Sequence, residues 1–571
     1  MQVYGDLERV EEASLLVDEI RQRISQCQDL PAGLQRHQKI VAAFIRASEL
    51  VQGVVDADFA VAGEDDATEN HVAGASLLLT LAQAVAISWD SGFRDLALPD
   101  VGPLHLLCRA GAVRTKQAEG YAFYAVYPEA YLAAARQSGL GRNTTVIGIR
   151  SIGASLAAVV AAAIGARPAL TVRPVGHPFS RKMALSDALA ARLQWGNGDY
   201  AIVDEGPGLS GSSLNCVADW LAANGVDERR IHFFPSHNGD LGAAASAEHR
   251  KRWSGAAKHV VPLDEVILEA PHPWHRLENW IAAALGPLDA PLYDLSGGAW
   301  RKFRAEEDWP PADPAMERLK FLALVGGKRW LAKFAGIGTS GEAQFELARR
   351  LSGAGFAPEP ACLCHGFIVL PWIDEKPVRQ HLPPLARVLD YLACRASLPP
   401  TNSGASLSEL FAMAANNFGE HWGAPAEAAV RSALGDPQRF HPILCCTDNR
   451  MHAWEWIHGA NGWQKLDALD HHAAHDMIGC QDIAWDIAGA STELAMSPAR
   501  RNALTTALGA RIGRRIDPDL VAVCELCYLG FQIGLWSMAL ARNGAEEHER
   551  IQQRLDFYDL RARQTLQELT A

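Results

Sequence analysis

A short stretch, V-D-E-G-P-G-L-S-G-S-S-L at residues 203–214, decides the fold of the N-terminal half of this 571-residue chain. A buried strand pattern, Y-A-I-V at residues 200–203, leads into two adjacent acids, Asp204 and Glu205, and then into a Gly- and Ser-rich loop. A helix pattern begins directly after that loop. Backbone N–H groups of such a loop, together with a helix N-terminus, form a cradle for an anion. The two acids suit the hydroxyls of a ribose or the divalent cation of a diphosphate.

Strand and helix patterns alternate on both sides of this stretch. Three further buried strands are predicted at residues 145–149, 169–174 and 230–235, with helices at 154–164 and 214–224. Alternating strands and helices are typical of a parallel sheet covered by helices. Uninterrupted apolar strands agree, because both faces of such a sheet are buried. The sequence therefore predicts an α/β fold for this part of the chain.

The order of these elements resembles that of the type I phosphoribosyltransferases over residues 96–255. Three elements carry the resemblance: the strand end V-I-G-I-R-S-I-G at 146–153, the stretch H-P-F-S-R-K-M at 177–183, and the acidic loop at 203–214. In that family these elements bind diphosphate, cover the reaction centre and bind the ribose phosphate, respectively. The resemblance implies Mg²⁺-dependent transfer of a phosphoribosyl group from phosphoribosyl diphosphate, or the reverse reaction.

The resemblance also implies roles for individual residues. Asp204 and Glu205 would be catalytic acids and ligands of Mg²⁺. Arg150 and Lys182 would neutralise the charge of the departing diphosphate. The phosphates would be bound by the loop residues Ser151, Gly153, Gly206, Gly208, Ser210, Gly211, Ser212 and Ser213.

Two alternatives stay open in this half. His237 and Asp240, in P-S-H-N-G-D after the fourth strand, are predicted to contact an acceptor base, but residues of a surface turn explain them equally well. A doubly wound domain in which D-E-G is a plain turn would share the same order of strands and helices. Release of diphosphate from phosphoribosyl diphosphate would separate the enzyme from these alternatives.

Residues 316–571 predict a second module of different architecture. The pattern L-K-F-L-A-L-V-G-G-K-R-W-L-A-K-F at 319–334 predicts a hairpin that turns at its two glycines. A helix at 341–352 and a strand at 366–371 follow, and the remainder is mainly helical. This order resembles the aminoglycoside-phosphotransferase branch of the protein-kinase-like fold, which is an α+β fold.

By this second resemblance, Lys333 would hold nucleotide phosphates and pair with a helix acid, Glu346. Asp448 would occupy the place of the catalytic-loop Asp, and Asp470 would bind the metal of Mg-ATP, with Asp467 as the alternative. Where the family has His-Gly before the catalytic Asp, this chain has Cys-Thr, and an alanine replaces the Asn that usually follows. An active phosphotransferase and a degenerate nucleotide-binding domain therefore both stay open.

The remaining segments carry no catalytic motif. Residues 1–95 are predicted to form a helical extension that caps the neighbouring domain or mediates a homodimer, and residues 256–315 a connector rich in Pro, Trp and acids. His471 and His475 stand four residues apart, a spacing that suits a metal site on a helix. A polar loop explains the two histidines as well.

The composition limits the function classes. With 49% hydrophobic and 21% charged residues, each domain can bury its own core. The net charge of −13 argues against a general nucleic-acid binder. No apolar run is expected to reach the about 18 residues that cross a bilayer, and the acidic N-terminus lacks a signal-peptide pattern. The chain is therefore predicted to be cytoplasmic, to bind no membrane and to keep its cysteines reduced.

Together these patterns predict an α/β chain with two functional parts: a parallel-sheet phosphoribosyltransferase-like domain with a helical N-terminal extension, followed by an α+β kinase-like domain. The predicted function is that of a bifunctional enzyme acting on small molecules of nucleoside or nucleotide metabolism. Its first part would transfer phosphoribosyl groups, and its second would bind or use ATP. The alternative is a regulatory protein that senses phosphoribosyl diphosphate or nucleotides and carries a degenerate kinase-like domain.

Overall fold

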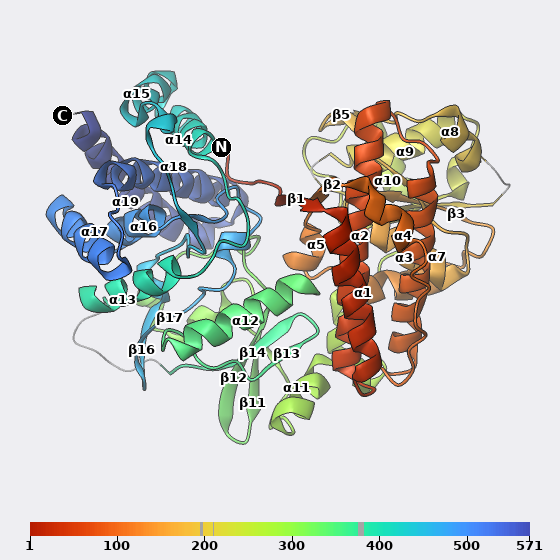
Figure 1. The fold of residues 1–571 in the computed structure, drawn as a ribbon, viewed down its shortest axis with the longest axis horizontal. Helices are drawn as coiled ribbons and strands as arrows, with labels where there is room; N and C mark the ends of the chain where they lie inside the picture. Colours follow the sequence, from red (N-terminus) through yellow and green to blue (C-terminus); the bar gives the residue numbers. More distant parts are fainter. Residues whose placement is uncertain (195–197, 209, 375–381, 571) are drawn as a thin grey trace.

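The computed structural model describes residues 1–194, 198–208, 210–374 and 382–570. Two halves lie side by side, the N-terminal one with the predicted parallel sheet and the C-terminal one with a separate antiparallel sheet (Figure 1). The parallel sheet has five strands in the order β4-β3-β7-β8-β9, and all four neighbouring pairs run parallel. Their bounds are Leu170–Val172, Thr145–Ile149, Tyr200–Val203, Ile231–Phe234 and Ala257–Lys258.

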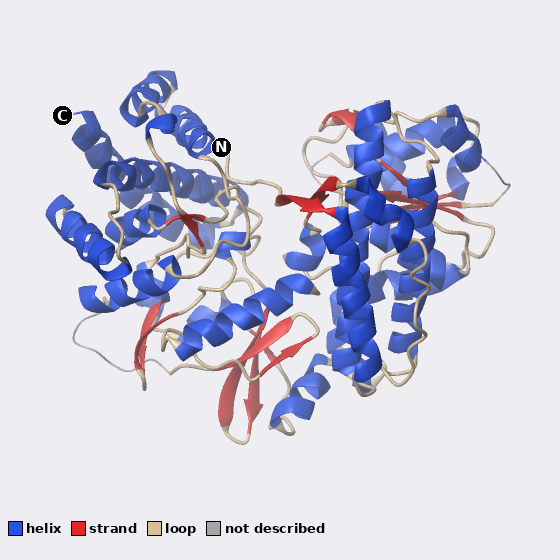
Figure 2. Ribbon diagram, viewed as in Figure 1, coloured by secondary structure: helices blue, strands red, loops and turns tan. Residues whose placement is uncertain are grey.

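Helices cover both faces of this sheet, as the apolar strands predict (Figure 2). On one face α7 packs against α6 and α3, and on the other the side chains of α8 and α9 share a core with Ile147 and Ile202. The small hairpin β5–β6 stands where the sequence predicts a flap. The bounds are α6 Pro128–Gln137, α7 Gly153–Ile164, β5 Val175–His177, β6 Ser180–Lys182, α8 Asp187–Gln194, α9 Ser212–Ala223 and α10 Ala247–Gly255.

The N-terminal extension is helical, with α1 (Ala13–Asp29), α2 (Leu34–Ala62) and α3 (Glu69–Asp90) packed against the parallel-sheet core. A short ribbon of β1 (Glu8–Glu12) and β2 (Ala112–Lys116) joins it. The sequence also suggests β-like runs at 104–108 and 120–126, and this is wrong. The first segment forms the helical turn α4 (Leu104–Leu107), which directly follows Pro103, a residue whose fixed φ suits a helix start. The second begins with the helical turn α5 (Glu119–Ala122) and continues without a strand.

The C-terminal half begins with an antiparallel sheet of five strands in the order β10-β11-β12-β14-β13. The predicted hairpin is confirmed: β11 and β12 turn at Gly326 and Gly327, both of which have positive φ. The bounds are β10 Tyr293–Asp294, β11 Lys320–Val325, β12 Lys328–Phe334, α12 Thr339–Gly353, β13 Cys362–Cys364 and β14 Phe367–Pro371.

A mainly helical part follows this sheet. Its long helix α18 lies in the middle of the core and packs against α14, α16 and α19. The bounds are α13 Leu385–Ala396, α14 Leu407–Trp422, α15 Ala424–Leu434, β15 Leu444–Cys445, β16 Trp456–Gly459, β17 Gly462–Lys465, β18 Gln481–Asp482, α16 Ala484–Glu493, α17 Pro498–Ile512, α18 Pro518–Arg542 and α19 Ala545–Thr570.

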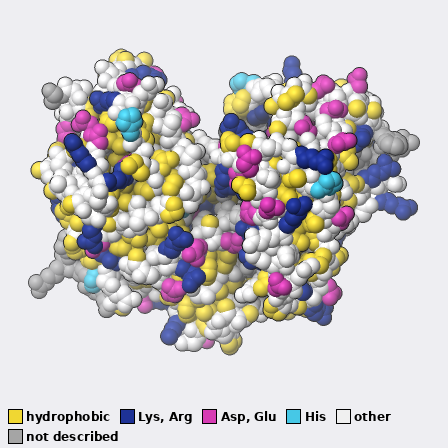
Figure 3. Space-filling view, viewed as in Figure 1, with side chains coloured by type: hydrophobic (Ala, Val, Ile, Leu, Met, Phe, Trp, Pro, Cys, Tyr) yellow, Lys and Arg dark blue, Asp and Glu magenta, His cyan; other side chains and the backbone are white. Residues whose placement is uncertain are grey.

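The two halves are joined at both ends of the first one. The segment predicted as a connector supplies an edge strand to each sheet, β9 to the parallel one and β10 to the antiparallel one, with α11 (Leu277–Leu285) between them. The chain start crosses to the C-terminal half, where Val3 is buried in the helical core and the backbone N–H of Gln2 donates to Asn417 Oδ1 at 2.6 Å. On the face shown in Figure 3, basic and acidic side chains are interspersed.

Two helices, α3 and α18, are long and apolar enough to cross a membrane, so the expectation that no apolar stretch has this length is wrong. In the most apolar 18-residue windows of these helices, 61% and 89% of the residues, respectively, are buried inside the structure. Both helices therefore pack here as core helices of their domains.

Candidate functional site

A cavity of about 880 Å³ lies at the carboxyl ends of the parallel strands. Asp204 and Glu205 line it directly after β7, and Ser151 and Ile152 line it after β3. Parallel strands bring their carboxyl ends to one edge of the sheet, which is where ligands bind in open α/β sheets. The predicted site residues that line this cavity are Arg150, Ser151, Asp204, Glu205, Gly206, Gly208, Ser213 and His237.

The carboxyl groups in this cavity are held in an environment that disfavours their charge. Burial raises the pKa of Asp204 to about 7, and burial together with the neighbouring Asp204 raises the pKa of Glu205 to about 8. A third acid of the same cavity, Glu119, has its pKa raised to about 8 by burial, Asp6 and Glu205. Carboxyl groups gathered in this way gain most from a cation, since a cation stabilises their charged form.

Glu205 lies against the backbone of Gly120, so that a Cβ built on Gly120 would stand only 2.7 Å from Glu205 Oε2. Any larger residue at position 120 would therefore push the carboxylate out of place. The hydroxyl of Tyr131 donates to the backbone oxygen of Asp204 at 2.9 Å and so holds the same strand end. These contacts fix the two acids in the wall of the cavity.

We expect Glu205→Gln to raise the melting temperature in the presence of a chelator, by a margin that grows from pH 5 to pH 8. The unfolded chain releases the Glu205 proton near its ordinary pKa of about 4.3, whereas the folded chain keeps it up to about 8. The folded state thus binds more protons in this window, and wild-type stability falls as pH rises. Calorimetric melts of both proteins across this range would measure the margin. Curves that stay parallel would contradict it.

The structure corrects the role predicted for Arg150. Its guanidinium is fully buried and points into the helical extension, where Nε donates to Asp56 Oδ1 at 2.9 Å and Nη2 forms an ion pair with Asp65. Its Nη1 donates to Thr171 O at 3.2 Å. Because its donors are already bound by protein groups, Arg150 ties the helical extension to the end of β3 and leaves no charged face for a diphosphate.

Two other arginines also line the cavity. Arg173, directly after β4, shares Asp56 with Arg150 and donates from Nη1 to Arg150 O at 2.6 Å. Arg181, on the flap hairpin, bonds a backbone carbonyl, Pro174 O, at 3.1 Å. The predicted Lys182 is exposed and is not among the described residues that line the cavity. The sequence could have indicated Arg173, because this residue follows the carboxyl end of a strand of the same sheet.

The serine hydroxyls of the loop are partly engaged by the flap hairpin. Ser210 Oγ and Ser212 Oγ both donate to Pro178 O, at 3.2 and 2.6 Å. In this structure the two hydroxyls hold the hairpin against the loop, and that they bind phosphate stays a prediction. Ser213 does line the cavity. Leu209, in the same loop, lies outside the described residues.

Of the glycines predicted to bind phosphate, some line the cavity and others are needed for close packing. A Cβ on Gly153 would come within 2.7 Å of Val203 O, so this glycine is required for close packing of α7 on β7. Gly211 precedes α9 with φ of 61°, and a Cβ there would meet Leu241 at 2.5 Å. Gly206 and Gly208 line the cavity. His237 lines it too, whereas Asp240 is not among the described lining residues.

A second cavity, of about 580 Å³, lies between the antiparallel sheet and the loops that surround hairpin β16–β17. Lys333 on β12 and Asp470 both line it, as the sequence predicts, and their charged atoms lie 3.4 Å apart. Lys333 also forms a closer ion pair with Asp467. Although burial opposes it, the two acids hold the pKa of Lys333 above its ordinary value. A buried cation and two carboxylates thus meet in one cavity.

The predicted pairing of Lys333 with Glu346 is not present. Glu346 lies on the exposed side of α12 and pairs with Arg349 and Arg350 of its own helix. The acid of α12 that makes long-range contacts is Glu342, which bonds Arg23 and Lys39 of the N-terminal helices at 2.7 Å each. The face of α12 that carries Glu346 is turned to solvent because Gln344, Leu347 and Leu351 fill the other face.

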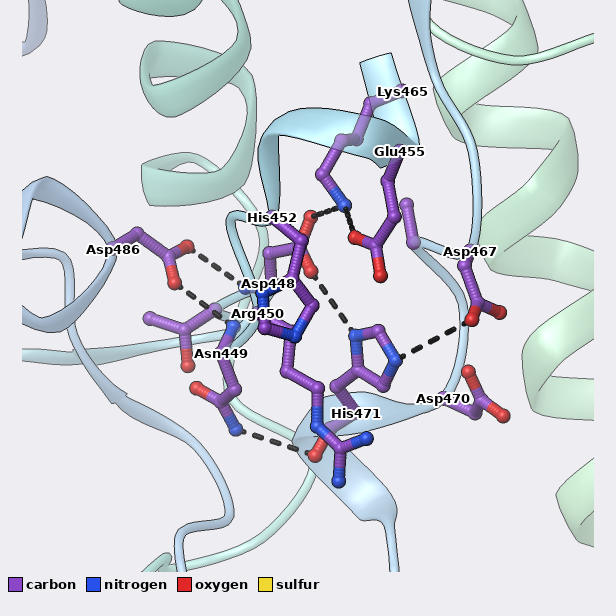
Figure 4. A network of polar contacts seen from close by, with 12 residues as sticks. Asp448, Asn449, Arg450, His452, Glu455, Lys465, Asp467, Asp470, His471 and Asp486 are labelled. Atoms are coloured by element: carbon purple, nitrogen blue, oxygen red, sulfur yellow. Dashed lines mark hydrogen bonds and ion pairs between the residues drawn. The ribbon is translucent and has the colours of Figure 1, made fainter. Parts of the chain in front are cut away.

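Asp448 is fully buried and surrounded by polar side chains (Figure 4). It is not among the described residues that line the second cavity. Its carboxylate accepts from Tyr391 at 2.5 Å and is paired with Lys465 at 3.2 Å and with His471 Nδ1 at 3.3 Å. Asp486 holds the same turn by accepting from the backbone N–H groups of Asp448 and Asn449. These bonds direct the carboxylate toward protein groups in this structure, and its catalytic role stays a prediction.

The two histidines with metal-like spacing do not converge. His471 faces Asp448 and Asp467, while His475 bonds Tyr124 at 2.5 Å and Glu119 at 3.2 Å. Asp482, at the end of β18, accepts from Ala484 N at the start of α16.

Comparison with known proteins gives likenesses to solved structures alone. The chain matches no protein-family model and no curated protein. A choline kinase from Streptococcus pneumoniae is 12% identical and aligns over 42% of this chain and 89% of its own, with a TM-score of 0.31. A macrolide 2′-phosphotransferase from Brachybacterium faecium is 16% identical over 48% and 94%, with a TM-score of 0.31. A spectinomycin phosphotransferase solved with ADP and spectinomycin is 14% identical over 52% and 97%, with a TM-score of 0.32.

These likenesses extend over about half of this chain, and the matched structures are named as phosphotransferases or kinases of small molecules. At such low identities and TM-scores, only the side chains of this chain itself can support a function.

The two cavities share a wall, the segment 118–127. Tyr124 lines both cavities. Arg318 bonds Asp470 of the second cavity through Nε at 3.0 Å and the carbonyl of Ala122 through Nη1 at 2.9 Å. One face of this segment therefore contacts the first cavity, while the other is bonded to the ion-pair network of the second.

Proposed function

We propose that the cavity at the carboxyl edge of the parallel sheet binds phosphoribosyl diphosphate with Mg²⁺ and transfers its phosphoribosyl group. The observation that carries this proposal is the adjacent pair Asp204 and Glu205, which stands between a Gly/Ser loop and a cavity that also receives Arg173 and Arg181. Carboxylates that lie beside an anion site favour a ligand with both ribose hydroxyls and a metal-bound diphosphate.

The charges of the cavity support a ligand that brings its own cation. Its wall carries Asp204, Glu205 and Glu119, whereas the charge of Arg173 is already shared with Asp56. A bare diphosphate would be repelled by such a wall. Carboxylate oxygens are the ligands that Mg²⁺ prefers, and the ion would offset the charge that grows on the departing diphosphate.

The proposed reaction breaks the bond between C1 of the ribose and the diphosphate oxygen, which keeps the bonding electrons. A new bond forms between C1 and a nitrogen of the acceptor, which then loses its proton to solvent or to a carboxylate. Arg181 faces the cavity from the flap hairpin and is placed to bind the diphosphate. The carboxylates at the end of β7 would orient the ribose.

For the second cavity we propose nucleotide binding without phosphoryl transfer. Lys333 supplies a buried positive charge for phosphates, and aromatic side chains suited to stacking on a base line the same cavity: Trp300, Phe303, Trp372, Trp454 and Trp536. A general base must reach the hydroxyl that it deprotonates, and Asp448 is enclosed by Tyr391 and Lys465. The burial of Asp448 therefore favours nucleotide sensing over phosphoryl transfer for the C-terminal half.

The function would be tested by incubating the protein with phosphoribosyl diphosphate, Mg²⁺ and a panel of nitrogen bases while diphosphate release is followed. Release with a base supports the transferase. Binding of phosphoribosyl diphosphate by calorimetry, without release for any base, would support the alternative, a sensor that uses the same site. If phosphoribosyl diphosphate is not bound and no diphosphate is released, the proposal for the first cavity is contradicted.

A further inference from the structure

A buried cluster of His37, Glu129 and His365 lies where three distant segments meet. His37 comes from α2, Glu129 from α6 and His365 from the turn between β13 and β14. The Nε2 atoms of His37 and His365 stand 2.9 and 3.2 Å from the same carboxylate oxygen, Glu129 Oε1. The side chains of these three residues are at most 1% exposed.

The cluster has more polar atoms than partners. Glu129 Oε2 and His365 Nδ1 are buried without a hydrogen-bond partner. No Lys or Arg of the described residues forms an ion pair with Glu129, and rings of Trp89, Phe93 and Trp280 pack around the histidines. An ionised carboxylate with two neutral imidazoles would bury an uncompensated negative charge, and buried charges in proteins are paired or bind metals.

The geometry fits a metal ion. Zn²⁺ is bound by His nitrogen and carboxylate oxygen at about 2.0–2.2 Å, which places tetrahedral ligands about 3.3 Å apart. The three ligand atoms here lie within 4.8 Å of one another, and two of the separations are already 2.9 and 3.2 Å. The unpartnered Glu129 Oε2 offers a fourth donor through bidentate binding.

The surroundings of His37 add a feature common to metal-binding histidines. Its other nitrogen, Nδ1, lies 3.0 Å from Ser88 Oγ, which is itself buried. When Nδ1 donates to this hydroxyl, Nε2 keeps its lone pair and points at the cluster. Metal-ligating histidines usually have such a hydrogen bond from the second nitrogen, which fixes the tautomer.

We propose that His37, Glu129 and His365 bind a divalent transition-metal ion of the Zn²⁺ type, which joins the N-terminal helices to the C-terminal sheet. The ligands are separated by 92 and 236 residues along the chain, so the ion would close two long loops. Because the cluster is enclosed, the ion would be taken up as the chain folds and would contribute to stability. None of the three ligands is among the described residues that line either cavity.

The test uses the full chain, purified without chelator from cells grown with added Zn²⁺, with metal content measured after acid release. We expect about one Zn²⁺ per chain in the wild type and at most about a tenth of that in Glu129→Gln and His365→Gln. His275→Gln is the matched control, because His275 is buried beside the cluster, stacked on Trp89 at 3.6 Å, without belonging to it. It should keep its metal.

A second measurement does not depend on the variants being folded. Wild type grown with Co²⁺ should show the visible absorption bands of Co²⁺ in a site of low coordination number. Its melting temperature should fall when a strong chelator removes the metal from partly unfolded protein and return on refolding with Zn²⁺. A wild type with no stoichiometric metal under either growth condition overturns the proposal, and so does metal that persists in both cluster variants.

Discussion

The double substitution Asp204→Asn with Glu205→Gln is expected to weaken Mg²⁺-dependent binding of phosphoribosyl diphosphate by a factor of about ten or more, which is about 1.4 kcal/mol. The two carboxylates line the first cavity, and burial raises the pKa values of both. The amide groups keep the size of the side chains but cannot become charged. They therefore lose the attraction to the ligand's cation while the fold is retained.

Calorimetric titration of wild type and variant at pH 8 with Mg²⁺ would measure this loss. Asp219→Asn with Glu228→Gln is a matched control, since these two acids of the same domain bind Arg252 and do not line the cavity among its described residues. The control should bind like the wild type. Equal affinity in a folded Asp204 and Glu205 variant would sink the assignment of this edge as the ribosyl phosphate site.

The sequence could predict the parallel strands because each is a short apolar run that both faces of the sheet bury. Ile147 and Ile202, which are paired across β3 and β7, are fully buried. It could also predict that Asp204 and Glu205 line one cavity, since the carboxyl ends of parallel strands gather at one edge. Local pattern and sheet geometry are enough for these two predictions.

The partners of the charged side chains could not be predicted in the same way. Arg150 pairs with Asp56 and Asp65, which precede it by 94 and 85 residues, and no local pattern reports such pairs. The run at 120–126 is mostly buried, with Tyr121 2% exposed, although Tyr124 is 46% exposed. Apolar character alone does not separate a strand from a helical turn in so short a segment.

In the second cavity, too, some contacts could be predicted from the sequence pattern and others could not. Lys333 stands in an alternating strand and Asp470 follows the facing hairpin, so their approach could be predicted from the pattern. Glu346 could not be distinguished from Glu342 without knowing which face of α12 is buried. The neutralisation of Asp448 depends on Lys465, which is close in sequence, and on Tyr391, which is not.

Mg-ATP is expected to stabilise the wild type by about 2.7 kcal/mol when its concentration is 100 times its dissociation constant, and this gain should be absent from Lys333→Ala and Asp470→Ala. Lys333 is 6% exposed, and its positive charge faces the second cavity, where phosphates would replace part of its pairing with Asp467. Asp470 now binds Lys333 and Arg318, and it would bind the metal that accompanies the nucleotide.

Thermal melts with and without Mg-ATP would measure the gain, with Lys328→Ala as the matched control. Lys328 lies on the same strand β12 but is exposed at its far end, so its loss should leave the shift unchanged. Each cavity variant must be compared with its own ligand-free melt, because removing Asp470 also removes the ion-pair partner of Arg318, which then keeps only its hydrogen bond to Ala122 O in the wall that the two cavities share. If no nucleotide raises the melting temperature of the wild type, the C-terminal half is a scaffold that binds no nucleotide. A shift that persists in both variants would place the nucleotide elsewhere, because a ligand held by this ion-pair network must lose affinity when either charge is removed.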